Sequence, residues 1–271
     1  MLIERNTFIR DGLVLSVASF GTGRPIVFQH GLGGDAAQTA DVFPQNAGWR
    51  ALTLECRGHG RSEPGPPEGF SISTFAADVA AMIEAYGAAP LPVGGISMGA
   101  AVALRIASTR PDLVSALILA RPAWLDAPRP DNMRPNRFVG ELLRDYTKED
   151  AREIFEKSLL AQRLAQEAPD NLVALRGFLR RDDVDVTREL LLRIPDDGPG
   201  LDRRAIASLR MPALVIGNGR DAVHPLEMAR ELAHLLPGAH FAEIVSKSDD
   251  RDRYREGFRT AVAAFLKDCT Q

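Results

Sequence analysis

The feature that most constrains the fold is the motif Gly-Ile-Ser-Met-Gly at residues 95–99, which stands between two different kinds of segment. Residues 91–96 form a short apolar run that is typical of a buried strand, and residues 100–108 are small and apolar, as in a helix packed closely on a sheet. Glycines two positions before and after Ser97 relieve the crowding of a sharp turn from strand to helix. Such a turn lifts the Ser97 hydroxyl above the edge of the sheet, and the start of the helix offers free N–H groups to a developing anion.

The rest of the chain predicts an α/β fold with a mostly parallel sheet, because short apolar strands alternate with helical patterns. An Asp-Gly turn at residues 11–12 predicts that the first two strands, 7–10 and 14–19, form an antiparallel hairpin at the edge of the sheet. The further strands are expected at residues 25–29, 49–54, 91–96, 114–120, 212–217 and 241–245. Helices are expected at residues 73–86, with a serine cap, and at 100–108, 225–236 and 250–267.

The pattern changes between residues 122 and 202, where no strand is expected and prolines cluster at positions 122, 128, 130 and 135. Charged helical patterns follow at residues 139–146, 149–168 and 171–180. We therefore predict a core formed by residues 1–121 and 203–271, with an inserted helical unit at 122–202.

Composition and charge exclude several classes of protein. The chain of 271 residues is 45% hydrophobic and 25% charged, which indicates an ordinary globular protein. Its net charge is -3 and its basic residues are scattered, so nucleic acid is not an expected partner. No apolar run approaches the roughly 20 residues of a membrane span, and the first residues do not resemble a secretory signal.

The two cysteines, Cys56 and Cys269, cannot form a framework of disulfides, so free thiols in a reducing, cytoplasmic setting are expected. No cluster of histidine, cysteine and carboxylate residues has the spacing of metal ligands, so no metal or other cofactor is expected. A small molecule is the expected partner, and the oligomeric state stays open.

A second glycine motif, His-Gly-Leu-Gly-Gly at residues 30–34, directly follows the strand at 25–29. This loop can present the N–H of Leu32, which together with the N–H of Met98 would form an oxyanion hole. His30 itself is interpreted as structural, with its ring holding the loop. A third turn-rich segment, residues 55–62, carries no chemistry alone.

These three motifs, in this order, strongly resemble the α/β-hydrolase family over nearly the whole chain. The resemblance implies that residues 122–202 are a cap that shapes the substrate pocket and that the third motif is structural. Glu55 stands where the family usually has aspartate. A serine at the turn is typical of esterases, lactonases, thioesterases and C–C hydrolases rather than of haloalkane dehalogenases or epoxide hydrolases.

The family places an acid and then a histidine after the serine. Asp221, which follows the strand at 212–217 and precedes a helix, is the predicted acid, with Asp126 as the fallback. The histidine usually lies on the loop after the last strand, but residues 245–250 of this chain contain none. The histidine that usually serves as the base is therefore missing from its usual position in this chain.

Two residues are candidates for the missing base. Lys247 lies inside that loop, but it could act as a base only if its pKa fell from about 10.4 toward 7–8, and a nearby carboxylate would oppose this. Lys247 is therefore better suited to hold a substrate carboxylate or an oxyanion. His224 lies three residues after Asp221, near the carboxyl ends of the strands, and is the alternative base.

The predicted function is hydrolysis of a small carboxylic ester or lactone, with Ser97 as the nucleophile. One alternative is a catalytically reduced protein that binds a small acidic ligand or performs non-hydrolytic chemistry. A C–C bond hydrolase is a further alternative, because it needs the same serine turn. The residues that bind the substrate are not predicted.

Overall fold

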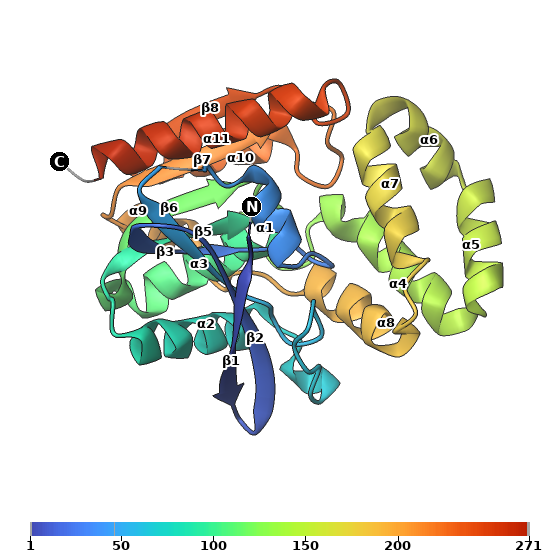
Figure 1. Ribbon diagram of the computed structural model, residues 1–271. Coiled ribbons are helices and arrows are strands. Elements are labelled where there is room, and N and C mark those ends of the chain that lie inside the picture. Colours follow the sequence, from blue (N-terminus) through green and yellow to red (C-terminus); the bar gives the residue numbers. More distant parts are fainter. Residues whose placement is uncertain (1, 46, 270–271) are drawn as a thin grey trace.

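A mostly parallel β-sheet organises the structure, a computed structural model that describes residues 2–45 and 47–269. Within these residues eight strands follow the order β1-β2-β4-β3-β5-β6-β7-β8, and all pairs from β4 to β8 are parallel (Figure 1). β1 and β2 form the expected antiparallel hairpin at the edge. The strands are β1 (Glu4–Arg10), β2 (Leu13–Gly21), β3 (Arg24–Gln29), β4 (Trp49–Leu54), β5 (Leu91–Ile96), β6 (Val114–Ala120), β7 (Ala213–Asn218) and β8 (His240–Ile244).

Helices cover both faces of the sheet, so the predicted fold class is confirmed. The helices of the described residues are α1 (Ala36–Val42), α2 (Ile72–Tyr86), α3 (Met98–Thr109), α4 (Arg134–Asp145), α5 (Lys148–Lys157), α6 (Leu159–Glu167), α7 (Pro169–Phe178), α8 (Val184–Arg193), α9 (Arg203–Ser208), α10 (Leu226–Leu235) and α11 (Arg251–Asp268). α1 and α11 pack on one face, and α2, α3, α9 and α10 pack on the other.

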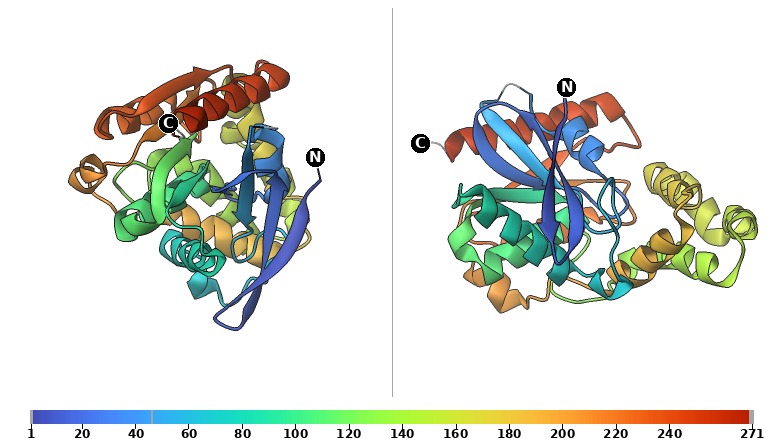
Figure 2. Two further views of the ribbon diagram at one scale, coloured as in Figure 1. Left: turned by 60° about the vertical axis from the view of Figure 1, so that its left-hand side comes forward. Right: turned by 60° about the horizontal axis from the view of Figure 1, so that its bottom comes forward.

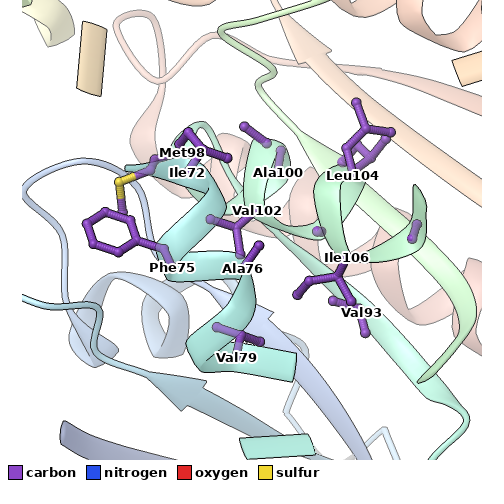
Figure 3. Close-up of a cluster of buried hydrophobic side chains, with 14 of the residues drawn as sticks. Ile72, Phe75, Ala76, Val79, Val93, Met98, Ala100, Val102, Leu104 and Ile106 are labelled. Atoms are coloured by element: carbon purple, nitrogen blue, oxygen red, sulfur yellow. The ribbon is translucent and has the colours of Figure 1, made fainter. Parts of the chain in front are cut away.

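The helix behind Ser97 is held firmly by the core. Figure 3 shows side chains of α2, among them Phe75 and Val79, packed against Met98, Val102 and Ile106 of α3. All of these side chains are almost completely buried. Because a well-packed interior resists displacement, the start of α3 is a rigid support for the serine.

Helices α4 to α8 form a separate layer with its own apolar cluster, which includes Val139, Phe155, Leu164 and Leu191. Figure 1 and the right-hand view of Figure 2 show this layer gathered at one end of the sheet. The chain enters the layer after β6 and leaves it before β7. It therefore lies beside the ends of the central strands.

Several predicted helix bounds were wrong. α2 begins at Ile72 and is capped by Ser71, whose hydroxyl accepts the N–H of Thr74, and not by Ser73. The helix expected at 149–168 is broken at Ser158, whose extended backbone (ψ 149°) ends α5 while its hydroxyl caps α6. α4 begins at Arg134 instead of residue 139, and α1, α8 and α9 were not expected.

No helix among residues 2–45 and 47–269 combines the length and the apolar character needed to cross a membrane.

Candidate active site

The carboxyl ends of the parallel strands meet at one edge of the sheet, and polar residues follow most of them directly. The loop at residues 30–34 follows β3, and the remaining polar groups follow the four strands beside it. In strand order these groups are Ser97 after β5, Arg121 after β6, Asp221 and His224 after β7, and Lys247 after β8.

Ser97 occupies the sharp turn that the motif predicts. Its backbone has φ 56° and ψ -111°, a strained conformation for a residue with a side chain. A Cβ atom on Gly95 would lie 2.6 Å from the carbonyl oxygen of Gln29, and one on Gly99 would lie 2.4 Å from the same oxygen. Only glycine fits at these two positions, because the neighbouring atoms belong to the backbone.

His224 lies between the serine and the acid. Its Nε2 is 2.8 Å from the Ser97 Oγ, and its Nδ1 is 2.9 Å and 3.0 Å from the two oxygens of Asp221. A carboxylate can only accept hydrogen bonds, so Nδ1 carries the proton and Nε2 accepts from the serine hydroxyl. The structure thus brings together three of the predicted residues in one hydrogen-bonded chain.

Asp221 is held as an anion although its side chain is only 2% exposed. Burial by itself would raise the pKa of this carboxyl, but the Arg121 and His224 groups hold it well below its usual range. Arg121 donates to Oδ2 from Nε at 2.9 Å and from Nη2 at 2.6 Å. Asn171 of α7 donates to Oδ1 at 2.9 Å, and its own oxygen accepts the N–H of Ala222.

Burial also sets the protonation state of His224. It lowers the pKa of the imidazole, Asp221 opposes this by its charge, and Arg121 reinforces it. The net pKa lies below the ordinary value of 6.5, so the ring is neutral at pH 7. A neutral imidazole with a free Nε2 lone pair can remove a proton from the serine.

Lys247 faces the carboxylate of Asp170 rather than that of Asp221. Its Nζ is 2.7 Å from Asp170 Oδ1, and the other oxygen of Asp170 is 3.5 Å from Arg121 Nη2. The residue that contacts Ser97 is His224, whereas Lys247 is ion-paired at the wall of the site. The fallback acid, Asp126, lies near Arg203 at 3.9 Å and does not line the site.

The loop after β3 leaves the N–H of Leu32 without an acceptor among the described residues. Gly31 donates its N–H to Gln38 Oε1 at 2.7 Å, and Gly34 donates to the Gly31 carbonyl at 2.8 Å. In the described part of the chain, the N–H groups of Leu32 and Met98 donate to no protein acceptor. Two unused donors therefore stand near Ser97, as an oxyanion hole requires.

His30 is buried and ties two loops together. Its Nε2 accepts the N–H of Cys56 at 3.0 Å, and its Nδ1 donates to the carbonyl of Gly31 at 2.9 Å. Both ring nitrogens are thus occupied by backbone groups. Glu55, fully buried, accepts the N–H of Ala36 at 3.1 Å and joins the third motif to α1.

A cavity of about 110 Å³ lies beside Ser97 and His224, between the sheet and the helical layer. The sheet and the helical layer each contribute both apolar and polar side chains to its walls. The lining residues are Gly31, Leu32, Gln38, Ile96, Ser97, Arg121, Met133, Asn136, Asp170, Asn171, Ala174, Leu175, Phe178, Val223, His224 and Lys247. A larger depression of about 680 Å³ on α4 is bordered by Arg134, Arg137 and Phe138 and does not reach Ser97. Chemistry, rather than size, identifies the smaller cavity as the site.

Sequence reasoning missed three residues here: Arg121, Asn136 and Asn171. Arg121 had a signal, because a charged residue directly after a buried strand lies at the edge where ligands bind. The two asparagines had none: Asn136 precedes the helical pattern at 139–146, and Asn171 is the first residue of the pattern at 171–180. Among the described residues, no group of three or more histidine, cysteine or acidic side chains is placed to hold a metal ion.

Comparison with known proteins gives one consistent result. Residues 24–249 match the family model described as the alpha/beta hydrolase fold. The chain is 32% identical over 237 residues to a candidate non-heme bromoperoxidase, BpoC, of Mycobacterium tuberculosis, covering 83% of this chain and 86% of that protein. It is 26% identical over 259 residues to a candidate carbamate hydrolase, RutD, of Klebsiella pneumoniae, covering 90% and 93%. The crystal structure of the enol-lactonase from Burkholderia xenovorans superimposes with a TM-score of 0.71 at 22% identity, covering 97% and 100%.

Proposed function

Because the chain belongs to the α/β-hydrolase fold family, we propose that it is a serine hydrolase of small carboxylic esters or lactones, with Ser97 as nucleophile, His224 as base and Asp221 as acid. The observation that carries the proposal is the contact of 2.8 Å between Ser97 Oγ and His224 Nε2. The base thus comes from the loop after β7, three residues after the acid, and not from the loop after β8.

The arrangement of Ser97, His224 and Asp221 fits a two-step mechanism. Ser97 attacks the carbonyl carbon of the substrate while its proton moves to His224 Nε2, and the N–H groups of Leu32 and Met98 bind the resulting oxyanion. Asp221 stabilises the imidazolium through Nδ1–H. The intermediate collapses to an acyl-serine, and the leaving alkoxide takes the proton from Nε2. Water then attacks the acyl group by the same route and releases the acid.

On this proposal residues 122–202 act as a cap, because α4 and α7 supply one wall of the cavity. The limited volume favours short acyl groups. Lys247 contributes charge at the wall through its pair with Asp170. The alternative of a catalytically reduced binding protein rests on the absence of a base, and the position of His224 weighs against it.

Covalent labelling tests the proposal. We expect a fluorophosphonate probe to label the wild-type protein at Ser97, and we expect Ser97→Ala to abolish both labelling and hydrolysis of short acyl esters and lactones. Ser246→Ala, at a serine buried after β8, is the matched control and should keep both activities. If wild type hydrolyses none of these substrates faster than Ser97→Ala, the proposal is wrong.

The dependence of activity on pH separates the two candidate bases. Burial lowers the pKa of His224, so its basic form persists below pH 6.5 and is lost only as the pH falls through that lowered pKa. We expect kcat/KM to be constant near pH 7 and to fall to half at a pH below 6.5. A lysine base would instead require a limb with a midpoint at about 7–8. Rates measured from pH 4.5 to 9 distinguish these outcomes.

A further inference from the structure

The turn at residues 31–34, which carries the N–H of Leu32, lies directly beside Ser97. A Cβ atom on Gly31 would lie 3.4 Å from the Ser97 Cβ, so the turn begins against the serine. Side chains of the core form hydrogen bonds with both the N–H and the carbonyl of Gly31. Among the described residues, none of them forms a hydrogen bond with Gly33 at the corner of the turn, where φ is +71°.

The corner of the turn is held instead from the helical layer. Arg181, which lies just after α7, donates a hydrogen bond from Nη2 to the carbonyl oxygen of Gly33. The Phe178 ring lies on the same corner, because a Cβ atom on Gly33 would be 2.2 Å from its Cε1. The side chain of Leu32 packs against both the core cluster and the cluster of the helical layer.

Arg181 itself is placed to hold this carbonyl. Its side chain is half-buried, its guanidinium lies 5.6 Å from the centre of the Phe178 ring, and it forms no ion pair with a carboxylate of the described residues. Arg176, one turn earlier, pairs with Glu156 on the surface of the layer. Stacking on an aromatic ring fixes the direction of a guanidinium, so Arg181 presents its donor to Gly33 in a defined position.

The two donors of the predicted oxyanion hole are therefore supported differently. The N–H of Met98 begins α3, and the Met98 side chain is fully buried in the core. The N–H of Leu32 belongs to a half-buried turn whose corner is bonded to the helical layer through Arg181. The position of the second donor thus depends on a residue outside the sheet and its covering helices.

We propose that Arg181 is a positioning residue for hydrolysis, which holds the Leu32 N–H in place for the oxyanion through its hydrogen bond to Gly33. The inference rests on the proposed hydrolase function and ties its rate to the seating of the helical layer on the turn. A donor of this kind acts on charge that develops in the transition state, so a small displacement lowers kcat more than it weakens substrate binding.

A set of arginine variants tests the proposal. With a short acyl ester we expect Arg181→Met to lower kcat by about 10- to 30-fold and to change KM by less than about twofold. Arg180→Met is the matched control, because Arg180 is the exposed arginine immediately before Arg181, and it should keep wild-type kcat. Arg181→Lys retains a cationic donor and should recover part of the rate.

Inhibitors separate a role at the oxyanion from a role in the shape of the cavity. Butylboronic acid forms a tetrahedral adduct with an activated serine, whereas butyramide stays planar and uncharged. We expect Arg181→Met to weaken inhibition by butylboronic acid by about the same factor as kcat, and to change inhibition by butyramide far less. Equal weakening of both inhibitors would assign Arg181 to the shape of the cavity and overturn the proposal.

A measurement without turnover examines the turn itself. Hydrogen exchange of the peptide that spans residues 30–38 should be faster in Arg181→Met than in wild type, because the hydrogen bond from Gly34 to the Gly31 carbonyl opens more often. Arg180→Met should exchange as wild type does. Melting temperatures of the variants show whether any faster exchange is confined to the turn or reflects loss of the whole fold.

The outcomes distinguish the inference from the function on which it rests. Wild type that hydrolyses esters, with Arg181→Met at the same kcat, would overturn the role of Arg181 and leave the hydrolase proposal intact. Unchanged exchange of residues 30–38 in Arg181→Met would overturn it even if no ester were hydrolysed. Wild type that neither hydrolyses esters nor reacts with a fluorophosphonate would instead refute the proposed function, and with it the role of Arg181 in hydrolysis.

Discussion

Replacing His224 by alanine is expected to lower kcat/KM for a short ester by about 10⁴-fold or more, because the serine then has no group to take its proton. His224 is the one ring whose Nε2 reaches Ser97 within the described residues, at 2.8 Å. Steady-state rates with an activated ester, measured beside Ser97→Ala, give the size of the loss. Added imidazole should restore part of the rate to His224→Ala and none to Ser97→Ala.

Two control variants sharpen this result. His234→Ala removes an exposed histidine of α10 and should keep wild-type rates. Lys247→Met breaks the ion pair with Asp170 but leaves the Ser97–His224 contact in place, so its loss should be far smaller than that of His224→Ala. If Lys247→Met lost as much activity as Ser97→Ala while His224→Ala stayed active, the lysine would be the base.

The second large effect is expected for Arg121→Met, which leaves the Asp221 carboxylate buried without its cation. Removal of one partner of a buried ion pair typically costs about 3–5 kcal/mol, and we expect a loss of this size in the free energy of unfolding. The two hydrogen bonds from Arg121 to Oδ2, at 2.9 Å and 2.6 Å, are lost together. Urea denaturation at pH 7 measures the change.

A double variant shows whether the effect arises from the unpaired charge. Arg121→Met combined with Asp221→Asn removes both charges and should be more stable than Arg121→Met alone. Arg230→Met removes an exposed arginine that pairs with Glu227 and Glu243 and should change the stability little. An unfolding curve of Arg121→Met that overlies that of wild type would show that Arg121 does not stabilise the buried Asp221 carboxylate.

The sheet could be predicted closely because its strands are apolar on both faces. The expected bounds at residues 49–54, 91–96 and 114–120 agree with β4, β5 and β6. Helix ends were harder, since Ser71 and Ser73 both precede the apolar pattern of α2 and either could cap it. The position of Ser158 inside a continuous helical pattern hides the turn between α5 and α6, where its backbone becomes extended.

From the sequence, the contact between Ser97 and His224 could be anticipated only as one of two possibilities, with Lys247 as the other candidate for the base. The loop after β7 was expected near the serine, but which way His224 turns depends on contacts from distant segments. Asn171 of α7 accepts the N–H groups of Ala222 and Val223, which orients that loop. No local pattern links residue 171 to residues 222–223, so the arrangement requires the three-dimensional structure.

Asp221 and His224 lie on the same loop, the one after β7, and this affects how the site responds to local opening of the sheet. β8 is an edge strand, paired only with β7, and three of its five residues are exposed. A base on the loop after β8, where the sequence resemblance placed it, would instead move with this edge strand. Here Ser97, Asp221 and His224 all follow strands of the sheet interior. Local opening of the sheet edge can therefore proceed without taking the proposed catalytic groups apart.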